Sequence, residues 1–158
     1  MTWIRGWMLI CALGAIVALL TVRQRLSAQV VGNSALLFNY VVGAGGFDTV
    51  IGISNASLSQ FGAVQRPGRC TLYYYGRGVN GSSAPAPQRT GFILPGTLTA
   101  FNLTQGSFDA QVDNRGAGFI GYMIVTCDFP LARGVAIVQD LGGQKFLAPI
   151  PATVIPAF

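Results

Sequence analysis

The sequence contains no histidine and no glutamate, and Lys145 is its single lysine among 158 residues. The absence of histidine excludes Ser-His-Asp triads, histidine general bases and histidine metal ligands. Charged residues make up only 9% of the chain, against about 25% in an ordinary soluble domain. A hydrophobic share of 51% excludes a charged, disordered chain. Length and composition therefore indicate one domain with an apolar core.

The first 28 residues have the layout of a secretory signal peptide. Arg5 precedes an apolar run over residues 8–20, and Ala28 provides a small residue for cleavage. The uncharged stretch between Arg5 and Arg23 is 17 residues long, whereas a membrane-spanning helix needs about 20. We therefore expect cleavage after Ala28, with a retained helical anchor as the alternative. The mature chain, 29–158, is expected to be extracellular or at the cell surface.

Removal of the signal changes the charge balance. Arg5, Arg23 and Arg25 are lost with it, which leaves seven basic residues against five acidic ones. No cluster of lysine and arginine remains that would neutralise nucleic-acid phosphates. Open sheet edges are usually protected by lysines, prolines and inward-pointing charges, and this chain has few of these. The low charge indicates a sugar-covered surface, a poorly soluble domain, or edges that are occupied in an assembly.

Two cysteines, Cys70 and Cys127, remain in the mature chain, and each lies in a strand-like run. In an oxidising compartment such a pair is expected to form a disulfide. The bond would close a loop of 57 residues, which the chain-entropy model values at about 4 kcal/mol. We expect it to join two strands of a sandwich, as an inter-sheet bond of the immunoglobulin type.

Short strands separated by turns are predicted throughout the mature chain, and no helical period is present. The expected strands cover 35–42, 49–55, 69–75, 90–94, 98–103, 119–129, 135–141 and 145–154. Segments 90–94 and 98–103 are expected to form a hairpin around Pro95-Gly96. Two prolines, Pro149 and Pro151, should confine the last strand to an edge or a bulged path. Seven or eight short strands predict an all-β, immunoglobulin-like sandwich, without the core tryptophan of antibody domains.

Three blocks carry a family resemblance: FDTVIGISN at 47–55, CTLYYYG at 70–76 and CDFPLARG at 127–134. They resemble a family of small secreted bacterial proteins with F-D-T-x-I-x-I-S-N, C-T-L-Y-Y-G and C-x-F-x-x-A-x-G blocks. Arg133 stands where such proteins often have histidine. The resemblance implies export and a β-sandwich. Some members resemble subunits of extracellular protein fibrils in which one sandwich donates a strand to the next.

Five aspartates are the only carboxylate side chains of the sequence, so the candidates for carboxylate chemistry are few. A glycosidase needs two carboxylates that face one another, and Asp48 with Asp128 is the pair we consider. Asp48 follows Gly45-Gly46-Phe47 and is expected instead to bind turn amides. Asp109, Asp113 and Asn114 share one loop but lack the spacing of an EF-hand. We predict no catalytic residue, no metal and no cofactor.

Tyr73, Tyr74 and Tyr75 follow one another in a predicted strand, so alternation places the first and third on one face. The face that does not enter the core could stack on a sugar ring, and these tyrosines are our candidate glycan contacts. Three N-x-[ST] sequons are further candidates for covalent glycans. They begin at Asn55, Asn80 and Asn102.

The segment 29–42 near the mature N-terminus is an apolar strand-forming arm. It can lie in its own sandwich or add to a neighbour's sheet, as in donor-strand complementation. Its assembly residues are expected to be Leu36, Phe38 and Tyr40 on one face, with Leu37 and Val41 on the other. Head-to-tail donation produces open filaments of one protein. We therefore predict a non-enzymatic subunit of an extracellular filament or surface layer, with a glycan-binding or adhesion module as the alternative.

Overall fold

The computed structural model describes residues 33–58, 64–142, 145–147 and 149–156. The expected signal segment with its helix lies outside these residues. In the part that is described, no helix is long and apolar enough to cross a membrane.

Two antiparallel five-stranded sheets make up the described chain, which confirms the prediction of an all-β protein. Sheet A has the strand order β10-β1-β6-β3-β4, and sheet B has the order β5-β2-β7-β8, with β9 also paired to β7. Sheet A consists of β1 (Ser34–Val42), β3 (Cys70–Gly78), β4 (Gln88–Arg89), β6 (Phe119–Cys127) and β10 (Thr153–Ile155). Sheet B consists of β2 (Phe47–Asn55), β5 (Leu98–Asn102), β7 (Ala132–Asp140), β8 (Lys145–Phe146) and β9 (Ile150–Pro151).

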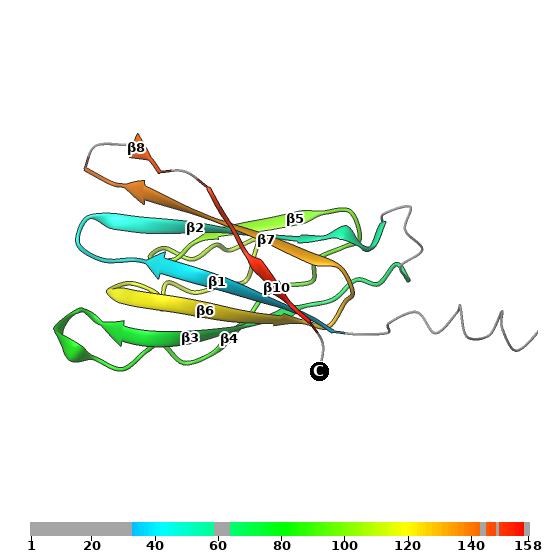
Figure 1. The fold of residues 1–158 in the computed structure, drawn as a ribbon, viewed down its shortest axis with the longest axis horizontal. Helices are drawn as coiled ribbons and strands as arrows, with labels where there is room; N and C mark the ends of the chain where they lie inside the picture. The colour runs from blue at the N-terminus through cyan, green and yellow to red at the C-terminus, as the bar shows by residue number, and fades with distance from the viewer. Residues whose placement is uncertain (1–32, 59–63, 143–144, 148, 157–158) are drawn as a thin grey trace, which may run out of the picture. The chain divides into compact units, whose positions relative to one another are not determined.

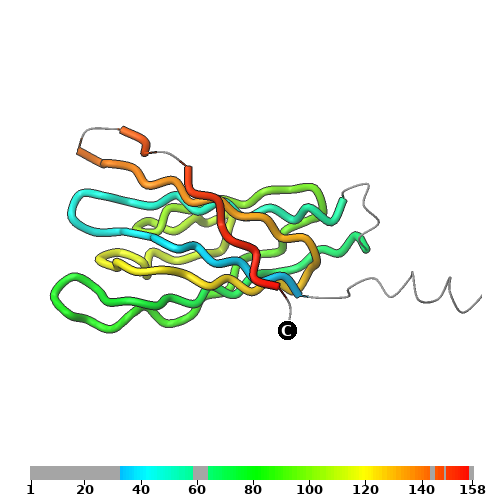
Figure 2. Tube along the Cα trace, viewed as in Figure 1, coloured from blue at the N-terminus to red at the C-terminus, as the bar shows by residue number. Residues whose placement is uncertain are grey.

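The chain passes twice from sheet A to sheet B through a short connection, once from β1 to β2 and once from β6 to β7 (Figure 2). The first connection, 43–46, contains three glycines. Gly45 and Gly46 have φ values of 63° and 84°, which side chains rarely adopt. A Cβ on Gly43 would lie 2.5 Å from the Gly116 carbonyl oxygen, so the close approach of two backbones also requires glycine there.

The core lies between the sheets and consists of the inward side chains of both. Leu36, Phe38 and Val41 of β1 are at most 1% exposed. β6 contributes Phe119, Met123 and Val125, while Ile51 and Ile53 come from β2. Between Phe38 and Val41 the pairing with β6 shifts by one residue, and this bulge reverses the expected faces: Tyr40 points outward and Val41 inward. Full burial of these apolar side chains is the main stabilising term of the fold.

The disulfide is present, but it lies within one sheet instead of between the two. Cys70 of β3 and Cys127 of β6 are direct cross-strand partners, with their Cα atoms 4.0 Å apart. Both sulfurs face the core, since the two residues are 0% and 1% exposed. The expectation of an inter-sheet bond was therefore wrong, because β3 and β6 are neighbours in sheet A.

The predicted hairpin of 90–94 with 98–103 is also wrong. The chain does turn at Gly96, where the Thr97 N–H donates to the Leu94 carbonyl at 3.0 Å. Beyond the turn, however, β5 pairs with β2 in sheet B, and Ile93 forms an isolated bridge with Gly68. The two arms of the turn thus pair with different partners.

The expected last strand is divided into three short strands along the edges of the sandwich. β8 and β9 pair with β7 in sheet B, and β10 pairs with β1 in sheet A. Figure 1 shows this C-terminal segment running diagonally from β7 across to the start of β1. Pro149 and Pro151 occupy it, in agreement with an edge position.

Tyr74 is a core residue of sheet A and should make stability depend on alkaline pH. Burial raises the pKa of Tyr74 to about 12, against the lowering effect of its hydrogen bond from Gln88. Between about pH 10 and pH 12 the folded form keeps a proton that the unfolded chain has lost. The contribution of Tyr74 to the free energy of unfolding is therefore fully present below pH 10. We expect it to be lost, by about 3 kcal/mol, as the pH rises through 12.

Urea unfolding of the wild type and of Tyr74→Phe, measured from pH 9 to pH 12, isolates this effect. The difference in unfolding free energy between the two proteins should change by about 3 kcal/mol over this range, because phenylalanine has no proton to lose. A difference that is independent of pH would contradict the assignment.

Candidate functional site

The outer face of sheet A carries a continuous set of apolar and aromatic side chains, which we call the aromatic face. The cross-strand register places Leu37, Ile124 and Tyr73 in one row across β1, β6 and β3. Tyr122 and Tyr75 form the next row, and the bulge of β1 sets Tyr40 opposite Tyr122. The aromatic face comprises Leu37, Tyr40, Tyr73, Tyr75, Ile120, Tyr122 and Ile124.

Two tyrosines of this face stack on each other across the strands. The rings of Tyr75 and Tyr122 lie 5.1 Å apart between centroids, with planes inclined by 10°. Tyr40, Tyr75, Ile120 and Tyr122 are each between 41% and 47% exposed. A sheet with one face in water normally alternates apolar and polar side chains, so this outer surface is unusually apolar.

Among the residues that the structure describes, charged side chains stand only at the two ends of the aromatic face. Arg77 pairs with Ile120 in the register at one end. At the other end Arg89 forms an ion pair of 3.3 Å with Asp128, whose second carboxylate oxygen accepts a hydrogen bond from the Arg69 N–H. Exposed pairs of this kind contribute little stability. The area between the two ends is free of charge.

Of the three candidate glycan contacts in the strand, only two lie on the surface. Tyr73 and Tyr75 belong to the aromatic face, whereas Tyr74 is 7% exposed and packs edge-on against Phe119 at 5.5 Å. Tyr40, which was predicted as an assembly residue, extends the same surface, and so does Tyr122, which was missed in the sequence. The run FIGYMIVTC of β6 contained the signal, because its even and odd positions are both apolar.

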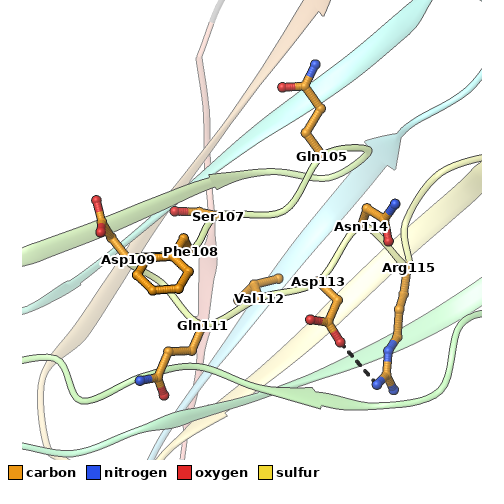
Figure 3. Close-up of a pocket in the computed structure, with 9 residues that line it drawn as sticks. All are labelled: Gln105, Ser107, Phe108, Asp109, Gln111, Val112, Asp113, Asn114 and Arg115. Carbon is orange, nitrogen blue, oxygen red and sulfur yellow. Dashed lines mark ion pairs between the residues drawn. The ribbon is translucent and has the colours of Figure 1, made fainter.

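A second surface is the open hollow of about 870 Å³ formed by the loop between β5 and β6. Phe108 projects from this loop and is 97% exposed. Figure 3 shows its ring between Asp109 on one side and the ion pair of Asp113 with Arg115 on the other. That ion pair measures 3.1 Å. The hollow thus combines one free aromatic ring with carboxylate, amide and guanidinium groups.

The loop is attached to the core through polar contacts. The Asp113 N–H donates to the Gln88 Oε1 atom at 2.8 Å, and Gln88 Nε2 donates to the Tyr74 hydroxyl oxygen at 3.1 Å. Across the described ranges, no group of three histidine, cysteine, aspartate or glutamate side chains gathers as metal ligands would.

Comparison with family models, with curated proteins and with solved structures finds no match to this chain.

Asp48 and Asp128, the carboxylates considered as a catalytic pair, lie at opposite ends of the sandwich. Asp48 precedes Thr49, whose hydroxyl hydrogen-bonds the backbone of Val42 at the end of β1. Asp128 follows Cys127, which pairs with Ser34 at the start of β1. As expected for a residue that binds turn amides, Asp48 accepts from the N–H groups of Thr49 and Thr104 at 2.7 and 3.1 Å.

The three sequons differ in accessibility. Asn55 is fully buried, so it cannot carry a glycan in the folded protein. Asn102 is half-buried, and the hydroxyl of its sequon residue Thr104 donates to Asp48 at 2.6 Å. Asn80 is exposed in the short 3-10 turn η2 (Val79–Gly81), where its φ is 70°. Of the three asparagines, Asn80 is the most exposed.

The described part of the predicted assembly arm, Ser34–Val42, lies in its own sheet. β1 is an inner strand, paired along its length with β6 and at its start with β10. Leu36, Phe38 and Val41 fill the core, while Tyr40 is on the aromatic face. The arm thus occupies a slot in the single chain that a strand of another copy could fill by the same contacts.

Proposed function

We propose that the mature protein is a non-enzymatic, secreted structural subunit that assembles into an extracellular filament or surface layer by exchange of β1 between neighbouring sandwiches. The observation that supports this best is the slot between β6 and β10. A chain that gives up β1 leaves the edges of β6 and β10 unpaired. It also leaves a cavity where four side chains were buried, those of Leu36, Phe38, Val41 and Val42. A second copy of β1 restores every one of these contacts.

The connection to β2 allows such an exchange. The segment 43–46 has three glycines, and there is open space beside the Cα atoms of Gly45 and Gly46. A hinge at these two residues could extend without displacing packed side chains, while the backbone bonds of Gly43 to Phe119 and Gly118 would be exchanged together with β1. Exchange of an identical element is an inexpensive route to assembly. In a head-to-tail arrangement it gives an open chain of subunits instead of a closed dimer.

Membership of the fibril-like family remains a proposal based on the three sequence blocks. The immunoglobulin-like class of the sandwich is also a prediction. Its size and two sheets agree with that class, whereas the disulfide within sheet A departs from the antibody pattern.

A covalent lock on β1 tests the proposed function. Ala35 of β1 and Thr126 of β6 are cross-strand partners with partly exposed side chains. In an Ala35→Cys/Thr126→Cys variant of the mature chain, an engineered disulfide would hold β1 in its own sheet. We expect the wild type to form filaments in negative-stain electron microscopy at rising concentration, and the locked variant to form none.

The controls are the single Ala35→Cys variant and the locked variant after mild reduction, because the buried native disulfide is less accessible to reductant. Both should form filaments. Filaments of locked protein in normal number would reject exchange of β1. A wild type that stays monodisperse at all concentrations would reject the assembly function altogether.

A glycan-binding or adhesion module is the second candidate, and the hollow with Phe108 favours it. An exposed aromatic ring can cover the apolar side of a sugar, while neighbouring amide, carboxylate and guanidinium groups can bond its hydroxyls. Absence of filaments, together with binding on a glycan array that Phe108→Ala abolishes, would support this alternative.

A further inference from the structure

The aromatic face is not covered by any other part of the described chain. The inner face of sheet A packs on sheet B, and its outer face, the aromatic face, is apolar as well. Sheets that are apolar on both faces are normally covered on both. Contiguous exposed apolar patches of this kind mark interaction surfaces on soluble proteins.

We propose that the aromatic face is the lateral contact between two copies of this chain, which pack sheet A against sheet A. This inference rests on the proposed function and adds to it, since strand exchange joins subunits along a filament and this face joins filaments side by side. The occupant that we infer is a second copy and not a ligand.

The charge distribution favours a second copy. A surface that meets itself must bring no like charges together at its centre, and all seven residues of the aromatic face are uncharged. The ionic groups Arg77, Arg89 and Asp128 stand at its ends. A nucleic acid or an anionic membrane would require basic residues within the face. A flat sugar would find one face of the Tyr75 and Tyr122 rings already covered by the other ring.

The size of the face indicates a weak contact that gains strength by repetition. With about 200 Å² for a complete tyrosine side chain, the exposed parts of the seven residues amount to roughly 500 Å² per copy. Two copies would bury roughly 1,000 Å², at the low end of specific interfaces. A contact of this size binds two single molecules weakly. Along two neighbouring filaments the contact repeats at every subunit, so that the overall avidity is much higher than the affinity of one contact.

The experiment separates the lateral contact from strand exchange. It uses the Ala35→Cys/Thr126→Cys locked protein, in which β1 cannot leave, and measures self-association by analytical ultracentrifugation up to millimolar concentration. We expect a reversible dimer. A Tyr122→Lys substitution in the locked protein should weaken this dimer at least tenfold, since the symmetric contact would bury two lysines.

The matched control is Ala100→Lys, which places the same charge at an exposed position on the outer side of sheet B. It should leave the dimer unchanged. Both lysine variants should still unfold cooperatively in urea, with the midpoint of Tyr122→Lys lowered only by the loss of its stacking on Tyr75. A locked protein that stays monomeric, or a Tyr122→Lys dimer as tight as the reference, would overturn the inference whether or not the wild type forms filaments. Glycan binding that Tyr122→Lys abolishes, without any dimer, would also overturn it and assign the face to sugars.

Discussion

The free energy of unfolding of a Cys70→Ala/Cys127→Ala variant is expected to be about 4 kcal/mol lower than that of the oxidised wild type. The disulfide closes a loop of 57 residues, and its loss returns that entropy to the unfolded chain. The bond also fastens β3 to β6 at the end of sheet A where Asp128 accepts from Arg69. Since the whole stability of a domain of this size is about 5–15 kcal/mol, the loss is a large fraction.

Urea titrations monitored by circular dichroism measure this difference. The unfolding midpoint of the wild type should shift to a lower urea concentration on reduction, whereas the midpoint of the double alanine variant should not change with reductant. Equal midpoints for the oxidised wild type and the double variant would show that the bond constrains the unfolded chain much less than its loop length implies.

The second large effect is expected at Asn55, the last residue of β2. Its side chain is fully buried and makes four hydrogen bonds. Nδ2 donates to the carbonyls of Arg66 and Ile93 at 2.7 and 3.1 Å, while Oδ1 accepts from the N–H and hydroxyl of Ser57 at 3.1 and 2.6 Å. Asn55→Ala leaves these groups without a partner, at a cost of about 3 kcal/mol.

Asn55→Asp should be at least as destabilising, although it keeps the shape. A carboxylate cannot donate, so one oxygen would face two carbonyl oxygens in a buried site. The matched control is Asn102→Ala, a half-buried asparagine in β5, for which we expect a loss below about 1 kcal/mol. Equal urea midpoints for the Asn55 and Asn102 variants would show that the Asn55 contacts do not stabilise the fold.

The buried network also explains the first sequence block. Asp48, Thr49 and Asn55 of FDTVIGISN all bond backbone groups inside the protein. They connect β2 with the end of β1 and with the segments at 66, 93 and 104. These residues of the first block are therefore structural in this chain, whereas Tyr73 and Tyr75 of the second block, CTLYYYG, lie on the aromatic face.

The limits of several strands could be predicted from the sequence, but their partners could not. β1, β2 and β6 begin and end within two residues of the expected limits, because each is a run of apolar and β-branched residues next to glycine or other turn residues. Turn chemistry at Pro95-Gly96 correctly indicated a reversal. It carried no information on pairing, since β5 joins β2 through contacts distant in the sequence.

Two further features were beyond the reach of local patterns. The bulge at Asn39 and Tyr40 depends on how β1 fits β6, and it alone decides that Val41 and not Tyr40 enters the core. The aromatic face arises because outward residues from three strands come into register. Tyr73 was one of three candidate glycan contacts whose outward face the sequence left open, and its neighbours in the row, Leu37 and Ile124, could be recognised only from the sheet order.

The position of the C-terminal segment has a consequence for the connectivity of the fold. Ala35 and Ile155 are cross-strand partners, so the first and last strands of the sandwich end side by side. A short linker could join them without moving either sheet, and new ends could be opened in the exposed loop after β3. Circular permutation of this kind succeeds where the ends are close and the opened loop is exposed. We therefore expect a circular permutant that begins after β3 to form the same two sheets.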